Sequence, residues 1–485
     1  MKRVKFDAKA QRRKVKKLYG TAVGIAVLLL SACSMAPDYT RPEAPVPGDW
    51  PSGAAYQSET GTPGAKMVAE IPWREFILDP RLQRTIELAL ANNRDLRIAT
   101  LNVDKYRAFY QIERAALLPQ LNASGSGSVQ RLPADLSGTS SSEIYRQYSA
   151  GVGVSAYELD LFGRVRNLKD QALQEYFATE EAQRAAQITL IAAVAQSYLT
   201  LAADQEVLAL SRQTLESRQT SFGLIQKRFN AGVISALDLH QAQTLIDGAR
   251  VQNIQATRLV AQDENLLRML VGAALPAELL PAELGEGVLL QDLSPGVPSE
   301  SLLLRPDIIQ AEHKLKGANA NIGAARAAFF PRITLTGAAG FSSAELSGLF
   351  KSGSETWSFA PQIILPIFDA GRNRANLKVS KVEEEIAVAQ YEKAILTAFR
   401  EVADALAERG TIDEQLAALQ SLTAATAESA RLSTVRYEKG ADSFLSVQDA
   451  QRALFVAQQN LITARLARLS NLVTLYKVLG GGASK

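Results

Sequence analysis

The chain has 485 residues, of which 47% are apolar and 21% charged, so it is long enough and apolar enough to bury a large core. Its formal net charge of +3 comes from the N-terminus, because the residues after position 32 include 44 basic and 49 acidic side chains, a net of −5. This balance, without a basic and aromatic-rich patch, excludes nucleic acid as an expected partner.

The first 32 residues are typical of a lipoprotein signal peptide. Residues 2–17 hold nine Lys and Arg, and residues 21–30 are all apolar or small, too short for a transmembrane helix of about 20 residues. The segment ends in Leu30-Ser31-Ala32-Cys33, which resembles the bacterial lipobox. We predict that Cys33, the only cysteine, is acylated and anchors the chain; the alternative is an ordinary signal followed by a chance cysteine. Residues 33–72, rich in Pro and Gly, predict an extended tether.

Residues 73–273 form the first of two predicted repeats. A helix is expected over 80–117, where Pro119 stops it. Alternating residues predict two strands of about 10–12 residues, 120–131 and 149–161, joined by a polar loop. Residues 164–229 lack Pro and would make a helix of about 99 Å, followed by a turn at Gly232 and a helix over 237–271. An apolar residue recurs every seven positions in the long helix, as in a coiled-coil seam: Val194, Leu201, Leu208, Leu215, Phe222 and Phe229.

The same order of elements returns in residues 304–485, after a linker over 274–303. At an offset of 208 residues, Gly232 matches Gly440 and Phe229 matches Tyr437. The second repeat predicts a helix over 305–328, two strands, a Pro-free helix over 372–437 and a return helix over 444–478. Gly tolerates the positive φ that reverses a chain after a helix, so both glycines predict the turn of a helical hairpin.

One chain thus offers four strands and no apolar helix expected to cross a membrane. Four strands cannot close, and an open sheet edge in lipid leaves backbone groups without hydrogen bonds. Membrane barrels have at least about eight strands. The simplest closure is a symmetric assembly of three chains with twelve strands, although the sequence alone implies an oligomer without fixing the number.

Several stretches resemble the outer-membrane efflux channels of the TolC/OprM (NodT-type) family. They are 37–42, 73–82, 89–96, 304–308 and, above all, 318–331, Ala-Asn-Ala-Asn-Ile-Gly-Ala-Ala-Arg-Ala-Ala-Phe-Phe-Pro. The resemblance covers nearly the whole mature chain. It implies an α+β membrane protein: a homotrimer with a twelve-stranded transmembrane β-barrel, continued by a long periplasmic α-helical barrel with an equatorial domain. It also implies a periplasmic adaptor protein and an inner-membrane transporter of the resistance-nodulation-division type as partners, and the export of drugs or other small toxic compounds.

Other functions are less well supported. An enzyme is not expected, because the two histidines, His240 and His313, suit surface or packing roles and no metal-ligand spacing, cofactor motif or nucleophile motif is present. A lipid-anchored coiled-coil scaffold has no use for the alternating strands, and a passive porin has none for helices of about 100 Å. An outer-membrane duct for type I protein secretion has the same fold and remains the alternative to drug efflux.

Both hairpin turns, Gly232 and Gly440, are predicted to form the periplasmic tip and to dock the adaptor. Asp442, Ser446 and Asp449 are spaced i, i+4 and i+7, as on one helix face. By resemblance, Asp449 matches an acidic residue that rings the closed pore of TolC-like channels, and Asp238 and Tyr437 match positions that form a latch hydrogen bond. Position 442 departs from TolC, which has Arg there, and agrees with OprM-like channels, which have Asp. Three Asp442 side chains meeting on an axis would repel one another and raise their pKa.

Overall fold

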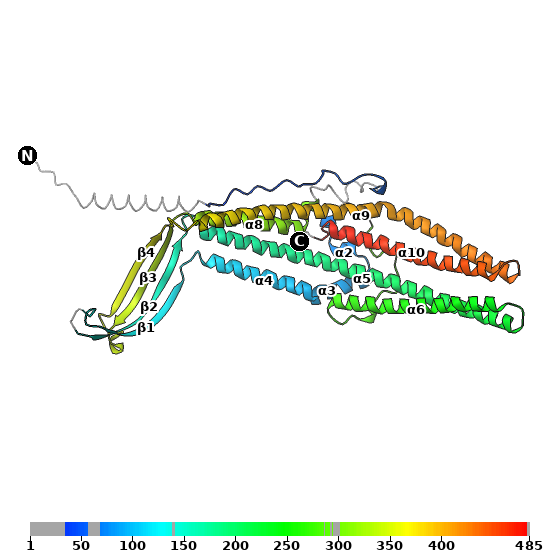
Figure 1. Cartoon of the computed structure of the whole chain (residues 1–485), viewed down its shortest axis with the longest axis horizontal. Helices are drawn as coiled ribbons and strands as arrows, with labels where there is room; N and C mark the ends of the chain where they lie inside the picture. Colours follow the sequence, from blue (N-terminus) through cyan, green and yellow to red (C-terminus); the bar gives the residue numbers. More distant parts are fainter. Residues whose placement is uncertain are drawn as a thin grey trace, which may run out of the picture. The chain divides into compact units, whose positions relative to one another are not determined.

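The computed structural model describes residues 34–56, 68–137, 141–285, 287–291, 293 and 301–482. Within these ranges a pattern of helix, strand, strand, long helix and return helix occurs twice (Figure 1). The first occurrence contains α3 (Pro80–Asn92), α4 (Arg94–Ala115), β1 (Leu121–Leu132), β2 (Glu143–Leu159), α5 (Arg164–Asn230) and α6 (Ala236–Val271). The second contains α8 (Pro306–Ala327), β3 (Arg332–Ser343), β4 (Glu355–Ile364), α9 (Arg372–Glu438) and α10 (Phe444–Val478). The described residues also form a short α-helix, α2 (Trp73–Phe76), and short 3₁₀ helices: η1 (Ala54–Tyr56), η2 (Val68–Glu70), η3 (Ala277–Leu279), η4 (Leu302–Leu304) and η5 (Leu346–Gly348).

The chain folds into two compact units, and each unit contains residues of both repeats. The first unit contains the sheet, and its described parts are residues 34–42, 103–179 and 311–390. The second unit contains the helical hairpins, and its described parts are residues 43–56, 68–102, 180–285, 287–291, 293, 301–310 and 391–482. Because α4, α5 and α9 run through both units, the spatial division differs from the division into repeats.

The sheet of the first unit has four antiparallel strands in the order β1-β2-β3-β4. The β2–β3 pairing joins the two repeats, and β1 and β4 remain as free edges. The polar loop predicted between the first two strands is shorter than expected, because residues 143–147 already pair with β1. These residues, Glu-Ile-Tyr-Arg-Gln, are all exposed, and they show no alternation of polar and apolar side chains that would have indicated a strand. A bulge between Val154 and Tyr157 interrupts the register of β2.

The helix predicted over 80–117 is broken at Asn93. The Asn93 side chain accepts a hydrogen bond from the Leu96 N–H at 2.9 Å and caps the start of α4. Its amide also donates to the carbonyl of Leu270 at 2.8 Å, at the end of α6. The break therefore forms where the return helix meets the joint between α3 and α4, a contact that periodicity in one segment does not reveal.

The two long helices, α5 and α9, have 67 residues each and are therefore about 100 Å long. The seven-residue seam of α5 begins as predicted, with Val194, Leu201 and Leu208 buried. Nearer the turn, the buried row changes to Ser211, Arg218 and Ile225, again seven residues apart. By length and composition α5 contains a stretch of 18 residues apolar enough to cross a membrane, contrary to our expectation, but 61% of that stretch is buried within the chain.

The core of the second unit contains parts of the predicted tether and linker. Val68, Ala69 and Ile71 are buried, so the tether becomes part of the fold before residue 72. Tyr476 stacks on Phe76 with 4.1 Å between ring centroids, and its hydroxyl donates to the Ile71 carbonyl at 2.8 Å. The linker returns to this core through backbone hydrogen bonds of residues 288–290 with residues 76–79. These contacts tie the end of α10 to the start of the first repeat.

Arg305 joins three elements in the second unit. Its guanidinium is buried and donates to the Val478 carbonyl at 2.6 Å, and it forms ion pairs with Asp307 at 2.7 Å and Glu401 at 2.9 Å. One buried cation therefore ties the start of α8 to α9 and to the end of α10.

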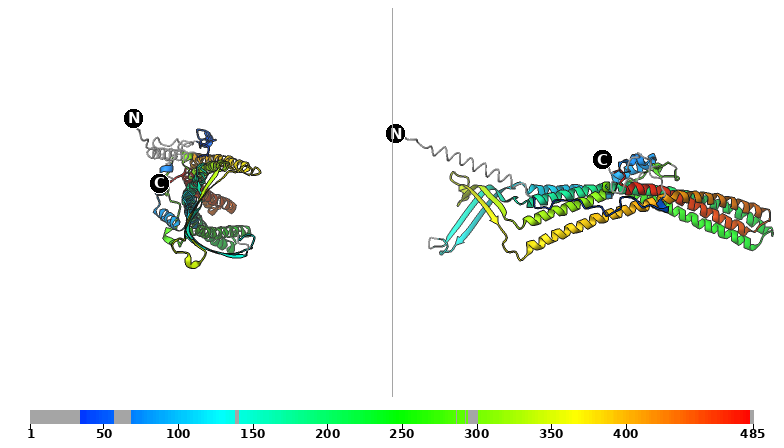
Figure 2. Two further views of the ribbon diagram at one scale, coloured as in Figure 1. Left: turned by 90° about the vertical axis from the view of Figure 1, so that its left-hand side faces the viewer. Right: turned by 90° about the horizontal axis from the view of Figure 1, so that it is seen from above.

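Two views at right angles show α5, α6, α9 and α10 running together as a bundle in this unit (Figure 2).

Candidate channel tip

The two hairpin turns have the same backbone geometry. Gly232 and Gly440 have φ angles of +70° and +71°. The Val233 N–H donates to the Arg228 carbonyl at 2.9 Å in the first turn, and the Ala441 N–H donates to the Arg436 carbonyl at 2.9 Å in the second. This is the Schellman arrangement, in which a left-handed glycine satisfies the last carbonyls of a helix. The predicted equivalence of Gly232 and Gly440 therefore extends to their local structure.

The helices that follow the turns begin differently. In the first hairpin, Ser235 and Asp238 form a reciprocal capping box, in which Ser235 Oγ accepts from the Asp238 N–H at 3.2 Å and Asp238 Oδ2 accepts from the Ser235 N–H at 3.2 Å. In the second, Ser443 makes no side-chain cap. The neighbouring side chain of Asp442 forms the hydrogen bonds at this turn instead. It accepts from the Ser443 N–H at 2.8 Å, from the Ser446 hydroxyl at 2.9 Å and from Arg436 at 3.3 Å.

These bonds set the charge state of Asp442 within one chain. The Ser443 N–H, the Ser446 hydroxyl and Arg436 together lower the pKa of the Asp442 carboxyl. Asp442 also precedes the first residue of α10, so it does not share a helix face with Asp449 as the spacing suggested. Asp449 is exposed and forms an ion pair with Arg452.

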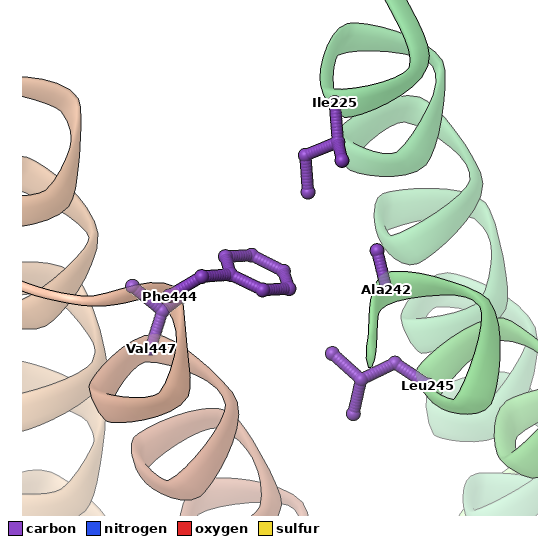
Figure 3. Close-up of a cluster of buried hydrophobic side chains, with 5 residues drawn as sticks. All are labelled: Ile225, Ala242, Leu245, Phe444 and Val447. Carbon is purple, nitrogen blue, oxygen red and sulfur yellow. The ribbon is translucent and has the colours of Figure 1, made fainter. Parts of the chain in front are cut away.

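A cluster of buried apolar side chains holds the two hairpins together just behind the turns. Phe444 and Val447 of α10 face Ile225 of α5 and Ala242 and Leu245 of α6 (Figure 3). Partly buried side chains pack around this cluster: Phe222, Ile234, Leu239 and Tyr437. The hairpins are therefore fixed to each other by direct apolar contact.

Tyr437 lies at the edge of this tip cluster. Its ring packs against Phe444 with 5.2 Å between centroids and lies under the guanidinium of Arg228 at 5.6 Å. Its buried hydroxyl has no hydrogen-bond partner among the described residues. Asp238 is engaged in its capping box, so the structure does not join Asp238 and Tyr437 by the latch hydrogen bond that the resemblance implied.

Sequence reasoning missed a buried cation behind the tip. Arg218 lines a groove of about 460 Å³ between α5, α9 and α10, together with Arg431, Glu438 and Phe455. Its guanidinium donates to the Leu245 carbonyl at 3.0 Å. Burial, and then the charge of Arg452, lower the pKa of Arg218. An Arg in the seven-residue row of Ser211 and Ile225 was the only signal, and an Arg at such a position usually faces solvent.

A carboxyl pair between α5 and α6 was also missed. Burial, and then a hydrogen bond and the charge of Asp204, raise the pKa of Asp263 to about 7. In the second repeat the residue matching Asp263 is Asn471, which donates to the Ala405 carbonyl at 2.9 Å and to Glu408 at 3.0 Å. The first hairpin thus has a carboxyl group with a raised pKa where the second buries a neutral amide.

The start of the predicted tether lies against the first unit. We call residues 34–42 the strap. Ser34 Oγ donates to Asn167 at 2.9 Å near the start of α5, and α8 binds two strap carbonyls, with Arg326 donating to Met35 at 3.0 Å and Asn319 to Pro37 at 2.9 Å. Gly323 allows this approach, since a Cβ there would lie 2.6 Å from the Ala36 nitrogen. Cys33 itself lies outside the described residues.

The two histidines have ordinary surroundings. His313 Nδ1 lies 2.7 Å from the side-chain oxygen of Gln174, and its ring packs beside Phe177. His240 lies in α6 with its side chain exposed. Among the residues that the structure describes, no three His, Cys, Asp or Glu side chains gather as a metal ion would need.

Comparison with known proteins gives a consistent result. The model of the outer membrane efflux protein family matches residues 85–273 and 297–481. Two curated relatives come from Pseudomonas putida: the antibiotic efflux pump outer membrane protein ArpC and the toluene efflux pump outer membrane protein TtgC. Each is 52% identical to this chain over 462 residues, which is 95% of both chains.

Among solved structures, the open state of the Neisseria gonorrhoeae MtrE outer membrane channel aligns with a TM-score of 0.83 and 40% identity, covering 93% of this chain and 99% of that one. The predicted fold class is confirmed: the chain has the fold of trimeric outer-membrane channels and supplies four strands. Its predicted outer-membrane location, extending into the periplasm, is confirmed as well, and family members are channels. The chain therefore belongs to the outer membrane efflux protein family, whose members are the outer-membrane components of efflux pumps.

Proposed function

We propose that this chain is the exit duct of a tripartite pump that exports drugs or other small toxic compounds, with organic solvents and antibiotics as the first candidates. The observation that carries the proposal is 52% identity over 95% of the chain to channels named for toluene and for antibiotic efflux. The alternative, a duct for type I protein secretion, shares the fold. Secretion lacks such support among these relatives.

We propose further that three identical chains assemble. The free edges of β1 and β4 support this, because an open edge in lipid leaves a row of N–H and C=O groups unpaired. Pairing β4 of one chain with β1 of the next closes a barrel of twelve strands. A periplasmic adaptor protein and an inner-membrane transporter of the resistance-nodulation-division type complete the pump.

We propose that Cys33 is acylated. The strap supports this, because Ser34, next to that cysteine, bonds to Asn167 in the first turn of α5, a few residues after β2 ends. The residue that follows the proposed acylation site therefore lies close to the end of the sheet. At the other end of the strap, burial alone would raise the pKa of Glu312. The ion pairs of Glu312 with Arg41 and Lys316 outweigh burial, so its pKa is lowered.

We propose that the two turns form the periplasmic tip, dock the adaptor and carry the gate. The matching Schellman geometry of Gly232 and Gly440 presents two similar hairpin ends to a partner. Asp442 and Asp449 supply the carboxylates of the gate, and each is balanced within the chain by an arginine. Asp238 and Tyr437 belong to the gate by shaping it: one caps α6, and the other packs against Phe444.

The test is deletion of the gene in its native host, followed by complementation with the wild-type gene. We expect susceptibility to toluene and to several antibiotics to rise on deletion and to return to the original level on complementation. The set of secreted proteins should stay the same in all three strains. Unchanged susceptibility together with a lost secreted protein would contradict the efflux proposal and favour type I secretion.

A further inference from the structure

An aromatic contact marks the place where the two repeats meet within one chain. Phe162, in the connection from β2 to α5, stacks on Phe330, in the connection from α8 to β3, with 4.8 Å between ring centroids. The contact lies beside the paired strands β2 and β3. An ion pair of 2.7 Å between Arg332 and Glu158 accompanies it. Repeat one therefore attaches to repeat two through a connection that precedes a long helix.

The internal duplication places similar residues at the matching position, yet leaves them exposed. Leu118 corresponds to Phe330: each precedes a Pro, and each N–H donates to the carbonyl three residues earlier, at 3.0 and 3.1 Å. Phe368 corresponds to Phe162, in the connection that precedes α9. Leu118 is 70% exposed and Phe368 is 89% exposed, so neither has the partner that its counterpart has.

We infer that Phe368 of one subunit packs on Leu118 of the next subunit, so that the contact within a chain is repeated between chains. The inference rests on the proposed homotrimer. In that assembly β4 pairs with β1 of a neighbour, which brings the β4–α9 connection beside the neighbour's α4–β1 connection, just as β2 and β3 bring Phe162 beside Phe330. The occupant of this apolar surface is thus a second copy of the chain.

The contact between subunits differs from the one within a chain in its chemistry. The residue that matches Arg332 is Gln120, which is uncharged, and the residue that matches Glu158 is Ile364. An ion pair like that of Arg332 with Glu158 therefore has no counterpart at these positions, and apolar burial by Phe368 and Leu118 provides the contact. Truncation of Phe368 should therefore weaken the assembly more than loss of an exposed aromatic elsewhere.

Cysteine crosslinking tests the contact directly. The double variant Leu118→Cys/Phe368→Cys, purified from outer membranes and oxidised, should give covalent dimers and trimers on a non-reducing gel. Each single variant should give none, which also controls for Cys33. The double variant Phe162→Cys/Phe330→Cys should give only a disulfide within one chain. An intact trimer on a native gel without crosslinks in the first double variant would overturn the inference, whereas a wild type that is not trimeric would overturn the proposed assembly.

Side-chain truncation provides a second measurement. Phe368→Ala should lower the temperature at which the trimer dissociates in detergent, and Phe368→Leu should restore most of it. Phe350→Ala is the matched control, because Phe350 is 72% exposed but lies in the β3–β4 connection. If Phe368 instead faced lipid, Phe368→Ala would leave the dissociation temperature unchanged and the inference would be wrong.

Discussion

Replacing Asp263 by Asn should remove a pH dependence from the first hairpin. In the folded chain the pKa of Asp263 is raised from its ordinary value of 3.8 to about 7, first by burial and then by Asp204. Between these two pH values the folded state holds a proton that the unfolded state has lost. Stability of the α5–α6 contact therefore falls as the pH rises from about 4 to about 7, and is level above that.

The size of the effect follows from the shift. About three pKa units correspond to at most about 4 kcal/mol, at 1.36 kcal/mol for each unit. Asp263 is partly open to solvent, which screens its charge, so we expect about 1–2 kcal/mol. Asn at this position resembles the second repeat, where Asn471 is buried with two hydrogen bonds. It keeps the shape of the side chain and adds no charge beside Asp204.

Hydrogen exchange of the assembled channel, followed by mass spectrometry and corrected for the intrinsic pH dependence of exchange, measures this locally. Wild-type peptides from the α5–α6 contact should lose about three- to eight-fold in protection between pH 5 and pH 8, since about two of the three pKa units fall in this range and 1.36 kcal/mol is tenfold. Asp263→Asn should show little change between these pH values. Asp247→Asn, an exposed change on the same helix, should behave like the wild type. Equal protection of the wild type at both pH values would refute the raised pKa of Asp263.

Five further substitutions test the anchor, the turns and the gate. Mass spectrometry should find an acylated Cys33 at the mature N-terminus, and Cys33→Ser should lose the lipid while the trimer still assembles; a mature N-terminus elsewhere would contradict the anchor. Gly440→Val forces a φ of +71° on a β-branched residue, at a cost of at least about 1–2 kcal/mol, so export should fall with the trimer intact, whereas Gly248→Val, in the regular helix α6, should export normally. Normal export by Gly440→Val would mean that the turn does not dock the adaptor. Asp442→Ala and Asp449→Ala should each raise single-channel conductance in a planar bilayer and weaken its cation preference, and no change in either would place the constriction elsewhere. Tyr437→Phe should leave conductance unchanged, since the Tyr437 hydroxyl makes no hydrogen bond within the described residues. A rise in conductance would instead support the latch hydrogen bond of Tyr437.

Much of the helical framework was predictable because its signals are local. The long helices begin at Arg164 and Arg372, as the Pro-free stretches predicted, and end within a residue of the predicted positions. The glycine turns were placed correctly, because a helix end and a left-handed glycine are set by hydrogen bonds within six residues. The family resemblance depended on short motifs of the same local kind, and it supplied the barrel and its location.

Contacts between distant segments decided the rest. The helix breaks at Asn93 because the side-chain amide of Asn93 donates a hydrogen bond to the Leu270 carbonyl, 177 residues away in the chain. The early start of β2 depends on pairing with β1, since its first, exposed residues show no alternation of polar and apolar side chains. The burial of Arg218 and the raised pKa of Asp263 beside Asp204 depend on which helix faces which. The sequence alone thus determined where chain elements begin and turn, and the tertiary structure decided which side chains are buried, paired or left for another subunit, because burial and charge pairing depend on neighbours that are remote in the chain.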